Sequence, residues 1–247
     1  MANFLVQEVQ GLSCSIVQKN AKSLSVRQWL TIMRQGSLLT TLVLKLFMLV
    51  KNFSKPDMDY KHDIKNYFDK VKETIDKISV EDLDTLMNIL NKARDENRFV
   101  FICGNGGSAS TASHYCCDFN KGISSNQQRK FRFVCLSDNI PSMMAYANDF
   151  SYEEIFVGPL RNLFNEGDYV IGISGSGNSS NVIKALQYAN EHGGVSIGIT
   201  GYDGGIVKKI SQYNVHVPIM DMQVSEDLHL MLDHCMMSIL CEYGEKR

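Results

Sequence analysis

The sequence predicts an α/β fold in which a five-stranded parallel sheet is covered by helices on both faces. Three observations predict it. Five short apolar segments read as buried strands, segments with helical spacing of apolar residues separate them, and glycine- and serine-rich turns follow several strands. Ligands of such sheets bind beyond the carboxyl ends of the strands. We therefore expect the turns to carry the binding site.

The composition narrows the class of protein. The 247 residues are 44% hydrophobic and 21% charged, which excludes a disordered, collagen-like or coiled-coil chain. A net charge of -2 argues against a dedicated nucleic-acid binder.

The longest apolar stretch, 38–50, is shorter than a membrane span of ~20 residues and contains Lys45. The first ten residues lack the basic start of a signal peptide. Seven cysteines without disulfide-type spacing favour a reducing compartment. We expect a soluble cytoplasmic protein with neither nucleic acid nor membrane as partner.

Residues 1–57 differ from the rest of the chain. They hold seven Lys or Arg and two Asp or Glu, a net charge of +5, against 18 and 25, a net of -7, in 58–247. Three interpretations stay open: an extension upstream of a true start at Met58, a helical accessory arm, or a segment that touches a membrane surface. We therefore divide the chain into an N-terminal extension, 1–57, and a domain, 58–247.

Two helices are predicted before the sheet. Apolar residues recur at helical spacing over 60–78, for example Ile64, Phe68, Val71 and Ile75. A second helix begins after Ser79, with Asp82 three residues on in a near-capping box.

The rest of the chain alternates between strands and helices. The predicted strands are 98–103, 131–136, 168–174, 194–200 and 213–218. The predicted helices are about 108–119, 140–148, 152–164, the segment that ends near 192, a short one after 203, and 223–241. This alternation predicts the parallel sheet.

The turn at 104–110, Gly-Asn-Gly-Gly-Ser-Ala-Ser, follows a strand and opens a helix. Glycines let a ligand approach the backbone closely, and the free N–H groups of a helix N-terminus favour an anion. A dinucleotide loop is the natural rival, but Ala109 stands where its third glycine belongs. The turn therefore indicates an anion site.

The turn at 174–179, Ser-Gly-Ser-Gly-Asn-Ser, has the same place after its strand. Its three hydroxyls can donate to phosphate oxygens, and the absence of a lysine from the loop argues against Walker-type nucleotide binding. Either turn alone would read as a plain connection. The two together predict a phosphate monoester on a small metabolite, without a nucleotide cofactor.

The motifs GNGGSAS, SDN, NDFSYEEIF, GDYVIGISGSGNSSNVIKAL, GITGYDGG and EDLHLMLDH resemble the sugar isomerase (SIS) domain and, within it, the phosphoheptose isomerase family, over about 58–242. The resemblance implies a flavodoxin-like three-layer fold preceded by N-terminal helices. It implies a homotetramer with active sites at subunit interfaces. It also implies conversion of sedoheptulose 7-phosphate to D-glycero-D-manno-heptose 7-phosphate through an enediol, early in the synthesis of heptoses for lipopolysaccharide or capsule.

Four residues are candidates for acid–base chemistry around a metal. His114 and Asp118 lie four apart on one helix face. By the resemblance, His114 matches a zinc ligand, His234 a catalytic histidine that also ligates zinc, and Asp118 the catalytic glutamate, likewise a zinc ligand. Glu226 matches a glutamine that binds substrate and metal. Because Asp118 is one methylene shorter than glutamate, we hypothesise that Glu226 compensates as base or ligand.

Helix geometry limits how these residues meet. Glu226 and His234 are ~12 Å apart along a helix, so they share a site only if Glu226 lies at or before the first turn. We expect His234 to lie off the apolar stripe, and His229 and Asp233 to be structural or interfacial. The predicted stripe is Leu228, Met231, Leu232, Cys235 and Ile239.

The resemblance also assigns substrate contacts. It places the substrate on Asn105, Gly106 and Gly107, with Asn148 and Asp149 near the sugar. It places the phosphate on Ser108, Ser174, Ser176 and Ser179. Gly175 also belongs to this site but stands where the family usually has threonine, so one side-chain contact is absent. Asp138 is a further candidate.

Other functions stay open. Related SIS proteins act as non-catalytic adaptors that bind the bacterial replication initiator, and a related ketose phosphate is an alternative substrate. A sugar-phosphate-sensing domain would need a DNA-binding segment, and 1–57 shows no clear helix-turn-helix. Since both His114 and His234 are present with carboxylates nearby, we favour the isomerase.

Overall fold

The computed structural model describes residues 58–244. Our interpretations of residues 1–57 concern a segment outside the described residues. No helix among residues 58–244 is long and apolar enough to cross a membrane.

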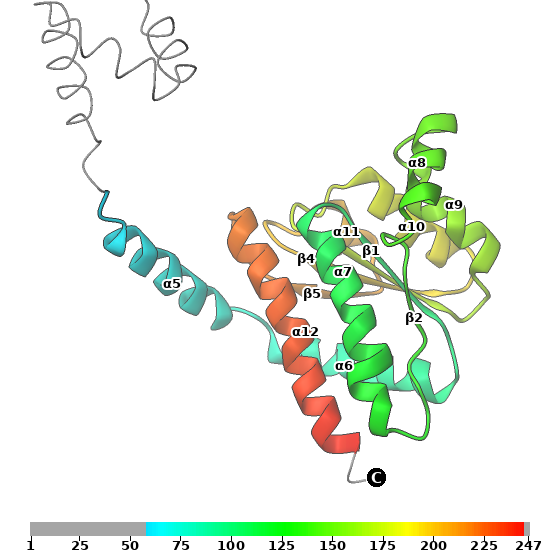
Figure 1. Ribbon diagram of the computed structural model, residues 1–247, viewed down its shortest axis with the longest axis horizontal. Helices are drawn as coiled ribbons and strands as arrows, with labels where there is room; N and C mark the ends of the chain where they lie inside the picture. The colour runs from blue at the N-terminus through cyan, green and yellow to red at the C-terminus, as the bar shows by residue number, and fades with distance from the viewer. Residues whose placement is uncertain (1–57, 245–247) are drawn as a thin grey trace, which may run out of the picture. The chain divides into compact units, whose positions relative to one another are not determined.

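The predicted fold class is confirmed: the described chain forms a five-stranded, wholly parallel sheet with helices around it (Figure 1). The strands are β1 (Val100–Gly104), β2 (Phe133–Cys135), β3 (Tyr169–Ser174), β4 (Val195–Thr200) and β5 (Tyr213–His216), in the order β2-β1-β3-β4-β5. The chain first adds β2 on one side of β1 and then adds β3, β4 and β5 on the other side. The order therefore reverses between β1 and β3, the place where ligands of open α/β sheets bind.

The helices lie where the sequence predicts them. They are α5 (Lys61–Ile75), α6 (Val80–Asp95), α7 (Gly107–Cys117), α8 (Ile140–Asp149), α9 (Glu154–Leu163), α10 (Ser180–Glu191), α11 (Gly205–Ile210) and α12 (Met222–Gly244). A π-helical turn, η1 (Asp118–Ile123), and a 3₁₀ turn, η2 (Ser124–Asn126), follow α7. Ser79 caps α6 as predicted, since its hydroxyl accepts the Asp82 N–H at 3.0 Å.

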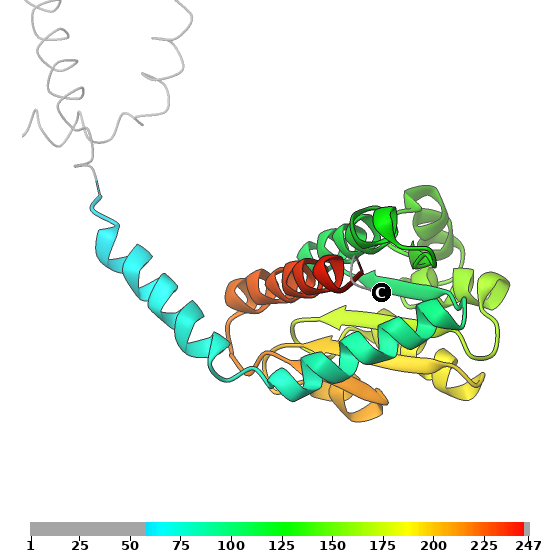
Figure 2. The ribbon, with the colours of Figure 1, turned by 90° about the horizontal axis from the view of Figure 1, so that it is seen from below.

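Two apolar clusters hold the layers together. Successive residues of β1 point to opposite faces: Ile102 lies in the cluster with Leu90 of α6 and Leu228 of α12, whereas Phe101 lies with Leu160 of α9 and Leu186 of α10. Figure 2 shows α7 and α12 side by side along the strands, and α6, which crosses in front of the strands in this view, packs in the same apolar cluster. This layer carries most of the candidate catalytic side chains.

β2 and the helix before it differ from the predicted bounds. β2 is only three residues long instead of spanning 131–136, and α7 turns into η1 at Asp118 instead of running to 119. The side chain of Asn120 in η1 bonds both backbone groups of Phe133, donating to its carbonyl and accepting from its N–H at 2.9 Å each. This side chain therefore takes the place of a strand neighbour at the start of β2.

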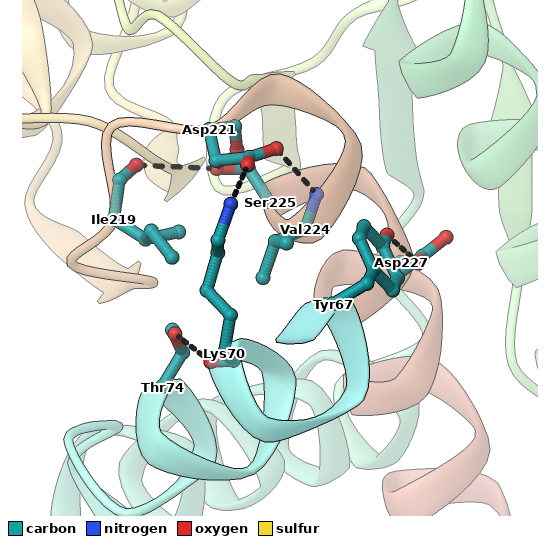
Figure 3. A network of polar contacts seen from close by, with 8 residues as sticks. All are labelled: Tyr67, Lys70, Thr74, Ile219, Asp221, Val224, Ser225 and Asp227. Atoms are coloured by element: carbon teal, nitrogen blue, oxygen red, sulfur yellow. Dashed lines mark hydrogen bonds and ion pairs between the residues drawn. The ribbon is translucent and has the colours of Figure 1, made fainter. Parts of the chain in front are cut away.

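The start of α12 is fixed by a polar network with α5 (Figure 3). Asp221 precedes the helix, and its Oδ1 accepts the Val224 N–H at 3.2 Å, which makes it the N-cap. Its Oδ2 lies 2.8 Å from Lys70 Nζ of α5. Three residues before Lys70 on α5, the Tyr67 hydroxyl donates to Asp227 of α12. The network sets the position of the helix that carries Glu226 and His234.

Replacing Asp221 by alanine should therefore destabilise the fold by about 1–2 kcal/mol, because the cap and the ion pair are lost together. Asp221→Asn keeps a capping oxygen and should cost less than ~1 kcal/mol, since the ion pair is solvent-exposed. Urea unfolding at one protein concentration measures both values. Equal losses in the two variants would contradict the assignment of the larger share to the cap.

Candidate functional site

The two glycine-rich turns meet at the reversal of strand order. Gly104 ends β1 in register with Ile173, one residue before Ser174 ends β3. The side chains of Asn105 and Asn181 join the turns through two hydrogen bonds of 2.9 Å. The Tyr152 hydroxyl also donates to Asn105 Oδ1 at 2.9 Å. The sequence predicted both turns, but it did not single out Asn181 or Tyr152, although both lie within the motifs quoted.

The predicted phosphate-binding hydroxyls gather at these turns. Ser108 is buried in the first turn of α7, and Ser174 ends β3. Ser179 stands at the N-cap position of α10 but makes no capping bond, and its hydroxyl lies 3.1 Å from that of Ser174. Ser176 Oγ accepts the Asn178 N–H at 3.3 Å, which leaves its own proton available to a ligand. These hydroxyls thus lie at the N-termini of two helices, α7 and α10, where an anion is favoured.

The side chain of Met222 packs against Gly175 in this chain. A Cβ built on Gly175 would lie 2.6 Å from Met222 Sδ, in the first turn of α12. Met222 therefore fills the space that a threonine side chain would need.

His114, Asp118 and His234 come together, as predicted, between α7, η1 and α12. The two Nε2 atoms of the histidines are 3.1 Å apart, and His114 Nε2 is 3.5 Å from Asp118 Oδ2. A fourth residue, Asp233, joins them, and one donor atom from each of the four lies within 4.8 Å of the others. Asp118 opens the π-helical turn, a local geometry that is frequent at functional sites.

Asp233 is one of the two residues of α12 for which we expected a structural or interfacial role. It is 0% exposed, and burial together with the nearby charge of Asp118 raises its pKa from 3.8 to about 8. His229, one turn earlier, is equally buried, and burial lowers its pKa to about 4. The two side chains lie inside the fold rather than on its surface.

The predicted apolar stripe of α12 was partly wrong. Cys235 is exposed and Ile239 half-exposed, while the buried positions are centred on His229 and Asp233. The residues of α12 that are buried are Val224, Ser225, Leu228, His229, Leu232, Asp233, Met236 and Leu240. A stripe drawn through apolar residues alone therefore rotates away from the true buried face.

Glu226 lies at the start of α7, beside Gly107. A Cβ built on Gly107, the first residue of α7, would be 2.3 Å from Glu226 Oε2. The carboxylate thus rests against a helix N-terminus, where a negative charge is favoured. Since α12 begins at Met222, Glu226 is its fifth residue and lies past the first turn. It does not belong to the group of four donors.

The remaining sugar-contact candidates lie apart from this group. Asn148 and Asp149 are exposed at the end of α8, where Asn148 donates to Asp149 at 2.9 Å. Asp138 accepts a hydrogen bond from Ser113 of α7 at 3.2 Å. These three residues stay candidates without a described contact to the two turns.

The four-residue cluster fits a divalent metal ion. Two imidazole nitrogens and two carboxylates are donors that zinc accepts. Asp118 Oδ2 and both carboxylate oxygens of Asp233 are buried without a hydrogen-bond partner in the described chain. Buried oxygens of this kind are costly unless a cation or a proton satisfies them. The cluster is therefore the candidate metal centre.

This chain is similar to phosphoheptose isomerases in both sequence and structure. Residues 60–201 match the family model of the SIS domain. A phosphoheptose isomerase of Aliarcobacter butzleri is 30% identical over 192 residues, which are 78% of this chain and 95% of that protein. One of Helicobacter pylori strain P12 is 34% identical over 179 residues, 71% of this chain and 90% of that protein. The solved structure of phosphoheptose isomerase from Neisseria gonorrhoeae superposes with a TM-score of 0.68 at 26% identity, covering 74% of this chain and 98% of that one.

Proposed function

This chain belongs to the SIS domain family and, within it, to the phosphoheptose isomerases, and we propose that it converts sedoheptulose 7-phosphate to D-glycero-D-manno-heptose 7-phosphate. Its product would enter the synthesis of lipopolysaccharide or capsule heptoses. We also propose that it works in the cytoplasm, where a buried free thiol such as Cys103 stays reduced.

One observation carries the proposal: a single helix joins the two ends of the site. α7 begins at the phosphate turn with Gly107 and carries His114 seven residues later, ~10 Å along its axis. In open-chain sedoheptulose 7-phosphate, the phosphate on C7 and the reacting carbons C1 and C2 lie at opposite ends. The spacing along α7 supports a substrate of this length.

We assign the proton transfers to side chains of the cluster and to Glu226. The carboxylate of Asp118, which lies beside His114, removes the proton from C1 and returns it to C2. Glu226, whose carboxylate rests on Gly107 at the start of α7, is the alternative base and requires the substrate to lie with C1 near Gly107 instead. We propose that His234 gives a proton to O2 as the enediol forms and takes the proton from O1 as the enediol collapses to the aldose. Nε2 of His234 cannot hold a metal and carry that proton at once, so the ligand role and the acid role are alternatives at this atom.

The proposed metal is zinc, held by His114, Asp118 and His234 with a further carboxylate. A zinc ion at this position would polarise the substrate carbonyl. Glu226, our first candidate for the further carboxylate, stays in the proposal as the residue that faces the substrate near the phosphate turn.

We propose that the enzyme is a homotetramer. The apolar face of α5 supports this proposal, since Tyr60, Ile64, Phe68 and Ile75 are exposed around it in the single chain. Contiguous exposed apolar surface of this kind marks protein–protein contacts.

The reaction is tested by adding sedoheptulose 7-phosphate to the purified full-length protein, with and without zinc, and following the aldoheptose 7-phosphate by NMR. We expect the aldose signals to appear. A folded protein that gives no product in either condition would instead point to a related ketose phosphate or to the adaptor function.

Replacing Ser176 by alanine should raise KM about 10–100-fold with little effect on kcat, because one hydroxyl that donates to the phosphate is lost. Initial rates at varied substrate concentration measure it. Ser125→Ala is the matched control, since Ser125 is exposed in η2 and donates to the Lys121 carbonyl. An unchanged KM would remove Ser176 from the phosphate site.

A further inference from the structure

Asp233 is the least expected member of the cluster. Among the four donors it is the most deeply buried, at 0% exposure, and both of its carboxylate oxygens lack a hydrogen-bond partner within the described residues. Structural aspartates inside proteins are normally bonded to N–H or O–H groups. The position of Asp233 is therefore unexplained by the fold alone.

No cationic side chain of the described residues offsets its charge. The described ion pairs include none to Asp233, and the nearest acidic neighbour, Asp118, is itself buried with Oδ2 unbonded. Two buried carboxylates beside one another repel, and histidines His114 and His234 complete the ring of donors around them. A divalent cation at the centre would satisfy all four groups at once.

The positions of Glu226 and Asp233 show which of these two carboxylates accompanies His114, Asp118 and His234. Glu226 rests on Gly107 at the start of α7, whereas Asp233 is the immediate neighbour of His234 on α12. Donor atoms around one zinc ion are about 3.3–3.6 Å apart, as follows from a tetrahedron with bonds of 2.0–2.2 Å. The four donor atoms of the cluster lie within 4.8 Å of one another, which is close to this spacing.

We infer that Asp233 is the fourth metal ligand of this enzyme, in the place that our sequence analysis gave to Glu226. This inference rests on the proposed function for the presence of the ion. It gives the chain a two-histidine, two-aspartate centre and leaves the Glu226 carboxylate free to face the substrate.

Zinc affinity of the full-length, metal-stripped protein tests the inference, measured by competition with a chromophoric chelator. Asp233→Asn, which keeps the side-chain shape, should weaken zinc binding at least tenfold. Glu226→Gln and the exposed-acid control Asp84→Asn should stay within about twofold of the unchanged protein. Unchanged affinity in Asp233→Asn, or a larger loss in Glu226→Gln, would overturn the inference.

Thermal unfolding separates a ligand from a purely structural aspartate. Without metal, Asp233→Asn should unfold at a temperature close to that of the unchanged protein, because the amide has nearly the shape of the carboxyl group that it replaces. With zinc, only the unchanged protein should show the large rise in Tm that ligand binding brings. A variant that is less stable in both conditions, yet gains as much from zinc, would show a structural role instead.

The inference and the proposed function fail in different ways. If the unchanged protein binds neither zinc nor another divalent metal ion, the inference is overturned, while the NMR assay of sedoheptulose 7-phosphate still decides the isomerase. If the protein binds zinc through Asp233 but forms no aldose, the metal centre stands and the proposed reaction does not.

Discussion

Replacing His234 by alanine should lower kcat at least 100-fold, within the range of about 10²–10⁴ that general acid–base catalysis supplies. His234 is exposed on α12, and its Nε2 lies 3.1 Å from that of His114. The side chain therefore adds little to the packing of the core, and the loss of activity should not come from unfolding. NMR-followed turnover together with circular dichroism measures both.

The zinc content of His234→Ala decides between its two proposed roles. Turnover lost with zinc retained supports the acid, whereas loss of both supports the ligand. His192→Ala is the matched control, because His192 is also exposed and stacks on Tyr188 at the end of α10, with ring centroids 3.9 Å apart. Full turnover in His234→Ala would contradict both roles.

Replacing Glu226 by glutamine should lower kcat about 100-fold while KM changes little, if Glu226 is the base that compensates for the short Asp118. The amide has nearly the same shape but cannot take a proton from carbon, and general-base catalysis contributes at least this factor. The measurement is the kcat and KM of the variant, with its zinc content determined in the same preparation.

A second variant tests the position of this carboxylate. Gly107→Ala places a methyl group 2.3 Å from Glu226 Oε2, so the carboxylate must move. It should reproduce the loss of kcat although Glu226 is still present. Normal turnover in both variants would assign the proton transfer at carbon to Asp118.

Much of the fold could be predicted because its signals are local. The five strands are nearly continuous apolar runs, as buried parallel strands are, and each lies within a residue or two of its predicted start. The cap at Ser79 needs only a hydroxyl three residues before an N–H. The resemblance added the pairing of His114 with His234, which lie 120 residues apart in the sequence.

The parts that could not be predicted depend on contacts between distant segments. The π-helical turn at Asp118 and the short β2 are linked through Asn120 and Phe133, which no local pattern connects. Tyr152 reaches Asn105 from the segment before α9 for the same reason. Each of these contacts exists only once the helices have packed on the sheet.

By itself, the sequence determined the parallel sheet, the two glycine- and serine-rich turns at its carboxyl edge and the family, because apolar runs, glycine turns and motif order are properties of neighbouring residues. Only the tertiary structure decided which carboxylate accompanies His114, Asp118 and His234. The sequence pointed to Glu226, but packing of α12 on the core turns Asp233 inward and carries Glu226 to the start of α7. The rotation of a helix is fixed by everything that it buries, and here that includes the polar His229 and Asp233.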